Sequence, residues 1–61
     1  MMMYPYQHYI VNTIKRNGFF DPVKEDITLR EKAQLDELIT AGIVAQEKGT
    51  THFVFVISSG A

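Results

Sequence analysis

The side chains that could bind a metal ion are few. The chain of 61 residues has two histidines, His8 and His52, and no cysteine. A zinc site needs three or four ligands at short spacings, so further ligands such as Asp21 or Asp26 would have to join the histidines. Their positions match no metal-ligand spacing. We therefore predict no metal site, and interpret both histidines as exposed side chains, one on a helix and one on a strand.

The residue types of hydrolytic catalysis are present without their usual spacing. Ser58 and Ser59 follow His52 closely, but no acid stands where it would orient the histidine. Asp36 and Glu37 are adjacent, and neighbours on a helix point about 100° apart, which favours solvent exposure over an acid–base pair. There is no glycine-rich phosphate loop, and so small a domain has little room for a deep pocket. We predict that the protein is not an enzyme and binds no cofactor.

Composition points to one small, soluble domain that gains stability from a partner. We expect residues 1–61 to form a single domain, with loose termini at 1–4 and 58–61. Hydrophobic content is ordinary for a folded chain, formal net charge is −1, and no apolar run approaches the ~18 residues of a membrane span. With neither a signal peptide nor cysteine, a cytoplasmic location is expected. Domains this small are marginal alone, so we predict a homo-oligomer or another protein partner, and no membrane partner.

The N-terminal third of the chain predicts a helix over residues 5–17. Pro5 suits the first helical position, and Gly18 suits a left-handed C-terminal cap. Positions at three- and four-residue spacing form one mostly apolar face. These are Tyr6, Tyr9, Ile10, Thr13, Ile14 and Asn17. Lys15 and Arg16 fall in the last turn, where cations complement the helix dipole.

A short connection follows, from Phe19 to Ile27. Phe19 and Phe20 are expected to plug the joint between this helix and the rest, and stacking on nucleic-acid bases is the alternative role. Between them and residue 28 there is room for at most one helical turn, around 22–25. Ile27 belongs either to a short strand or to the lead into the next helix.

A second long helix is predicted from its start and stop signals. Thr28 and Glu31 match the capping box, in which each side chain bonds the other residue's backbone N–H, and Gly42 suits the end. Leu35, Leu38 and Ile39 form the inward face. The opposite face carries Leu29, Arg30, Ala33, Asp36, Glu37 and Thr40, which begins apolar and ends acidic.

The C-terminal third predicts a β-hairpin, with strands at 44–48 and 51–58. Gly49 can supply the positive φ of a tight turn, whose central pair is either 48–49 or 49–50. Phe53, Phe55 and Ile57 point to one side and Val54 and Val56 to the other, so both faces are apolar. We expect a further element or another chain to cover the second face.

The stretch from Leu35 to Val56 resembles the third helix and wing of the winged-helix superfamily. The resemblance rests on Leu35-x-x-Leu38-Ile39-x-x-Gly42-Ile43-Val44, a polar turn, and His52-Phe53-Val54-Phe55-Val56. It implies a small α+β fold, ordered helix, short strand, helix, β-hairpin, with helix 5–17 as the first helix. The chain departs from the superfamily in lacking a clear second helix before the third.

The resemblance also implies DNA binding, but the residues favour a protein partner. On the helix that would read DNA, Asp36 and Glu37 would repel phosphates. We therefore predict a small binding module acting by protein–protein contact, a homodimeric regulator of bacterial or phage type. Its expected interface residues are Leu29, Ala33, Val54 and Val56. The alternative is a DNA-binding transcriptional regulator that contacts nucleic acid through Lys15, Arg16, Arg30, Lys32 and Lys48.

Overall fold

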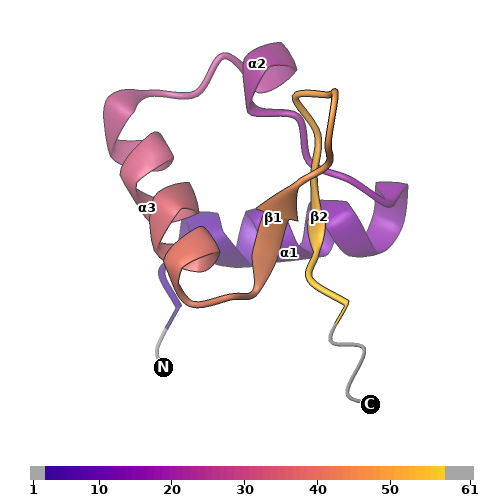
Figure 1. Ribbon diagram of the computed structural model, residues 1–61. Coiled ribbons are helices and arrows are strands. Elements are labelled where there is room, and N and C mark those ends of the chain that lie inside the picture. The colour runs from indigo at the N-terminus through magenta and orange to yellow at the C-terminus, as the bar shows by residue number, and fades with distance from the viewer. Residues whose placement is uncertain (1–2, 58–61) are drawn as a thin grey trace.

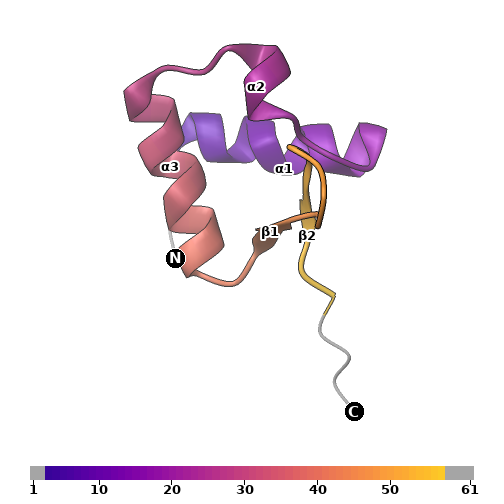
Figure 2. The same ribbon diagram turned by 45° about the horizontal axis from the view of Figure 1, so that its top comes forward.

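A computed structural model describes residues 3–57, which form a small α+β domain (Figure 1). Its elements are α1 (Pro5–Asn17), α2 (Pro22–Glu25), α3 (Leu29–Thr40), β1 (Val44–Gln46) and β2 (Phe53–Phe55). In Figures 1 and 2, α1 spans the width of the molecule, and α3 and the hairpin lie across it. Both α3 and β2 pack against α1. This arrangement is compatible with a winged-helix shape.

The bounds of α1 are those predicted, but its buried face is rotated. Pro5 begins the helix, and Gly18 ends it with φ +89° and an N–H bond to the Ile14 carbonyl. The buried residues of α1 are Gln7, Ile10, Thr13 and Ile14. Tyr9 is 40 % exposed and Asn17 is exposed, so the buried side of α1 does not coincide with the predicted apolar face. The spacing of apolar residues did not predict the burial of Gln7, because a glutamine is rarely buried unless its polar atoms are hydrogen-bonded.

The Gln7 side chain is a fully bonded polar group inside the core. Its Oε1 accepts from the Tyr4 N–H at 2.9 Å, where Tyr4 is the N-cap of α1. Its Nε2 donates to the Gln34 carbonyl at 3.0 Å and to Glu37 Oε2 at 3.1 Å. One residue thus ties the start of α1 to the middle of α3. Met3 packs against the core cluster and Tyr4 caps α1, while residues 1–2 and 58–61 of the expected loose termini lie outside the described residues.

Within residues 3–57 no strand lies between α1 and α3, and in its place Phe20 makes a single β-bridge. Phe20 and Phe53 exchange two backbone hydrogen bonds, of 2.9 and 2.7 Å, in an antiparallel bridge. Phe20 is fully buried, whereas Phe19 is 36 % exposed, so only one of the two phenylalanines is the predicted plug. Ile27 lies in no strand and leads into α3, with its side chain packed against the core.

The ends of α3 follow their predicted signals. Thr28 Oγ1 accepts from the Glu31 N–H, and Glu31 Oε1 accepts from the Thr28 N–H, which completes the capping box. Gly42 has φ +78°, and bonds from Gly42 and Ile43 back to the last turn close a Schellman motif. Leu35 and Leu38 are buried as expected, but Ile39, also assigned to the inward face, is 37 % exposed.

The hairpin is shorter than predicted, and its register is set. Val44 pairs with Phe55, Ala45 with Val54, and Gln46 with Phe53. The turn has Lys48-Gly49 at its centre, because the Thr50 N–H bonds the Glu47 carbonyl and Gly49 has φ +80°. The hairpin's inner face completes the core. The core cluster is Ile10, Ile14, Phe20, Leu35, Leu38 and Val44, with Phe53 and Phe55 packed against it.

We expect Gln7→Ala to destabilise the fold by about 2 kcal/mol, because it removes three hydrogen bonds and leaves a cavity where the buried side chain was. Urea unfolding measures the change. Asn12→Ala on the exposed side of the same helix is the matched control and should change the free energy of unfolding by less than about 0.5 kcal/mol. Equal effects of the two substitutions would contradict the role of Gln7.

Candidate interaction surface

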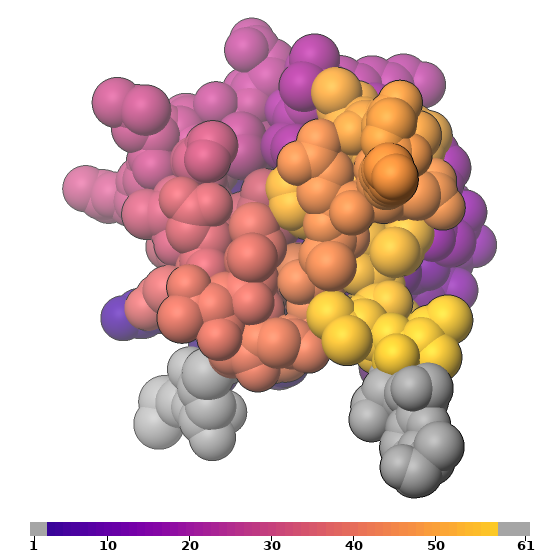
Figure 3. Space-filling model, in the orientation of Figure 1, coloured from indigo at the N-terminus to yellow at the C-terminus, as the bar shows by residue number. Residues whose placement is uncertain are grey.

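The outward side of α3 carries the most exposed apolar side chain of that helix. Leu29 is 89 % exposed, and Ala33, Asp36 and Thr40 follow it at spacings of four, three and four residues. These four residues, called here the α3 face, lie opposite the buried Leu38 on the helix. In Figure 3 the first turn of α3 projects from the left side of the molecule. The predicted interface residues Leu29 and Ala33 are therefore on one continuous exposed stripe.

Two shallow hollows lie beside this stripe. One, of about 400 Å³, is lined by Ala33, Asp36, Glu37, Thr40 and Ala41. The other, of about 300 Å³, separates α2 from the start of α3 and is lined by Pro22, Val23, Asp26, Ile27 and Lys32. Aliphatic atoms make up most of both surfaces. Such open, mostly apolar hollows suit a protruding side chain of another protein better than a small reacting ligand.

Apart from Glu31, whose carboxylate caps the start of the helix, charge along α3 divides by position. Arg30 and Lys32 lie in the first half, and Asp36 and Glu37 lie in the second half. Lys32 Nζ is 3.4 Å from Asp36 Oδ1, an exposed pair one turn apart. Glu37 is held by its hydrogen bond to buried Gln7, so the position of its carboxylate is fixed by the core. The α3 face is consequently flanked by cations at one end and anions at the other.

The other two predicted interface residues belong to the hairpin. Val54 is half-buried on β2, where it pairs with exposed Ala45, and Val56 is 45 % exposed just beyond the strand. Figures 1 and 2 both place the start of α3 on the side of the molecule away from β2. The predicted interface therefore divides into two separate surfaces, one on α3 and one on the hairpin.

The predicted nucleic-acid contacts fall in three places. Lys15 and Arg16 are in the last turn of α1, and Lys48 is in the hairpin turn. Arg30 and Lys32 are in the first turn of α3, at the opposite side of the molecule from the end of α1 (Figure 1). A hollow of about 540 Å³ beside Lys15 and Arg16 is lined by Tyr9, Asn12, Lys15 and Arg16. The five cations do not form one patch.

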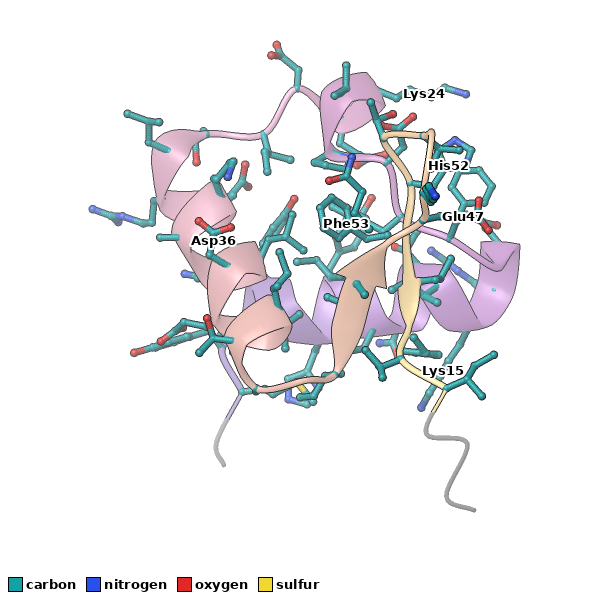
Figure 4. The ribbon with its side chains drawn as sticks, viewed as in Figure 1. Lys15, Lys24, Asp36, Glu47, His52 and Phe53 are labelled. Carbon is teal, nitrogen blue, oxygen red and sulfur yellow. The ribbon has the colours of Figure 1, made fainter. Side chains whose placement is uncertain are left out.

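A cluster of side chains that the sequence did not reveal joins the hairpin turn to α2. It consists of Asp21, Thr51, His52 and Phe19 and is called here the polar knot. Asp21 is the N-cap of α2, and its Oδ1 accepts from the N–H groups of Val23 and Lys24 and from Thr51 Oγ1 at 2.9 Å. His52 Nε2 lies 3.6 Å from Asp21 Oδ2 and forms an ion pair with it when protonated. Figure 4 shows His52 beside the hairpin turn.

Phe19 completes this knot. Its ring stacks on the His52 imidazole with centroids 4.1 Å apart. The sequence analysis expected an exposed His52. The structure instead has a half-buried His52, held between a phenyl ring and a carboxylate. The Thr51 hydroxyl donates to Asp21 and not to His52, so the three residues lack the order of a nucleophile, base and orienting acid. The sequence signal was Asp21 before Pro22, an N-cap followed by a favoured first helical residue.

The knot determines how Asp21 responds to acid. Partial burial raises the pKa of Asp21, but hydrogen bonds from Thr51, Lys24 and Val23 and the nearby His52 outweigh it, so the pKa is lowered from 3.8. A carboxyl whose pKa is lower in the folded chain takes up its proton first in the unfolded chain. Its stabilising effect is complete above about pH 4, and is lost as pH falls through the folded-state pKa.

We therefore expect the unfolding free energy to fall as pH drops below about 4, and to fall less in Asp21→Asn, whose amide keeps the cap without the titrating carboxyl. Urea unfolding between pH 2 and 6 measures both slopes. Asp26→Asn is the matched control, since it removes a carboxyl from the residue that ends α2 and leaves the Asp21 contacts in place. An unchanged acid profile in Asp21→Asn would show that the knot has no such effect.

Comparison with known proteins assigns no role to these surfaces. No family model, curated protein or solved structure matches it. Within residues 3–57 no group of three or more histidine, cysteine, aspartate and glutamate side chains is placed to hold a metal ion. None of the helices in that range is long and apolar enough to cross a membrane. The class that the structure defines is a small α+β domain with an exposed helix face.

Proposed function

We propose that this protein is a small non-enzymatic binding module that acts by protein–protein contact through the α3 face. The observation that carries the proposal is Leu29, which is 89 % exposed at one end of a stripe that has a mostly apolar hollow at its other end. Burying a leucine side chain contributes about 1.5–3 kcal/mol. A partner that covers this stripe gains that energy, whereas the isolated chain does not.

A helix is a suitable carrier for such a contact. The α3 backbone is held at its start by the capping box and at its middle by Gln7, so its outward side chains are presented from a rigid element. Preorganised surfaces lose less conformational entropy on binding. The small side chain of Ala33, next to Leu29 on the helix face, allows the backbone of a partner helix to approach closely. The role of a regulator of bacterial or phage type fits a compact domain of this kind.

Site-specific photo-cross-linking tests the proposal. A benzophenone side chain replacing Leu29 should give protein adducts, both with the purified chain and in extracts of producing cells. Matched probes at Ile57, equally exposed on the hairpin side, and at Asn12, on α1, should give far fewer. Adducts at position 57 and not at 29 would move the binding surface to the hairpin around Val56. Absence of adducts above the Asn12 level at every position would refute protein binding.

The alternative, a winged-helix DNA-binding protein, is supported by the order of elements and opposed by charge. The single Phe20 bridge between α1 and α2 is the counterpart of the short strand expected in such a fold. Asp36 and Glu37, however, lie on the helix that would enter the groove. Glu31 on the same helix and Glu25 in α2 add further negative charge near Tyr6, where burial is the main cause that raises the pKa to about 12.

For duplex DNA we expect weak binding with a shallow dependence on salt. Each cation group offers at most two phosphate contacts, so the slope of log affinity against log salt should be no steeper than about −2. If all five predicted cations contacted phosphates together, the slope would approach about −4.5. Fluorescence anisotropy over a salt series measures it. A slope near the larger value would establish the DNA-binding alternative.

A further inference from the structure

We infer that the α3 face binds a second copy of this chain, with the two α3 helices packed antiparallel. The inference rests on the proposed function, because it names the partner of the same surface. Leu29, Ala33, Asp36 and Thr40 recur at four-, three- and four-residue spacing, which is the spacing of a seam between two helices. The seam is exposed along its length and lies on a helix whose other side is already buried.

Charge selects both the partner and its direction. Arg30 and Glu37 are seven residues apart, so they lie on the same flank of the seam, two turns from each other. In a parallel pair, the seam residues face their own counterparts, so Asp36 of each copy would lie against Asp36 of the other. In an antiparallel pair, Arg30 of each copy faces Glu37 of the other, which gives two attractive contacts related by a two-fold axis. Charge thus favours the antiparallel direction, which separates the two Asp36 carboxylates and pairs Arg30 with Glu37.

Shape agrees with this direction. Antiparallel packing sets Leu29 of one copy opposite Thr40 of the other, at the hollow of about 400 Å³ lined by Ala33, Asp36, Glu37, Thr40 and Ala41. The protruding side chain and the hollow that receives it are both present on each copy. Two leucines are therefore buried by one symmetric contact, and Ala33 near the centre keeps the helices close.

Asp36 is the member of the seam that costs desolvation energy, and its surroundings limit that cost. Its carboxylate already pairs with Lys32 Nζ at 3.4 Å, and both side chains are more than half exposed. Lys32 lies on the flank opposite Arg30, so the pair can remain at the wet rim of the contact. A carboxylate that keeps its cation and some water loses less on association than one buried alone.

Sedimentation equilibrium of purified variants tests the geometry. We expect the wild-type chain to form dimers at micromolar concentration. Leu29→Ser should weaken the dimer about a hundredfold, since two leucines leave the contact, while equally exposed Ile57→Ser should not change it. R30E should weaken it about tenfold or more by placing like charges together. The double variant R30E/E37R should restore association, because the exchanged charges again face each other only in the antiparallel arrangement.

Circular dichroism of each variant first verifies folding, since Glu37 also bonds Gln7. If E37R is unfolded, R30E, L29S and I57S still decide the matter, because neither Arg30 nor Leu29 has a hydrogen bond or ion pair within residues 3–57 beyond those of the helix. A wild-type monomer at all concentrations, or a dimer unaffected by L29S and R30E, overturns the inference. Adducts at position 29 with a different protein would then leave the proposed function standing, whereas their absence would end both.

Discussion

The hydrogen bonds of Gln7 are the constraint on which the rest of the structure depends. A buried glutamine is tolerated only when its carbonyl and amide are both satisfied, and here their partners come from Tyr4, Gln34 and Glu37. These three bonds hold the start of α1 against the middle of α3. Once that crossing is set, the rotation of α3 about its axis is set too. Leu35 and Leu38 then face the core, and Leu29 faces outward.

Local signals were enough to place most elements from the sequence. Pro5 and Gly18 gave the bounds of α1, and Thr28 with Glu31 gave the start of α3, because caps and turn residues act through the backbone of their own neighbours. What could not be predicted depended on residues distant in the chain. The burial of Gln7 needs α3, which makes its partners, and no pattern within α1 reports it.

For the candidate site, too, local features could be predicted from the sequence, whereas contacts between distant residues could not. The exposure of Leu29 and the acidic end of α3 followed from helix periodicity alone. The separation of the hairpin residues from α3 did not, since it required the relative placement of two elements. The contact between Asp21 and His52 was likewise invisible, because a carboxylate and an imidazole far apart in sequence show no spacing pattern. The order of elements resembles that of a winged helix, but the cations are not distributed as DNA binding would require. Resemblance in fold therefore does not imply that function here.

The bridge between Phe20 and Phe53 has a consequence for how the chain acquires its structure. Phe20 sits between α1 and α2, and its strand partner comes after every helix. While β2 is missing, Phe20 cannot be held in the core by its bridge, and α2 cannot make its contacts with the hairpin turn. Closing so long a loop is slow and costs entropy before its contacts form. The helices are therefore expected to gain lasting order in a single cooperative step with the hairpin, so that a fragment ending before β2 would remain an unfolded chain.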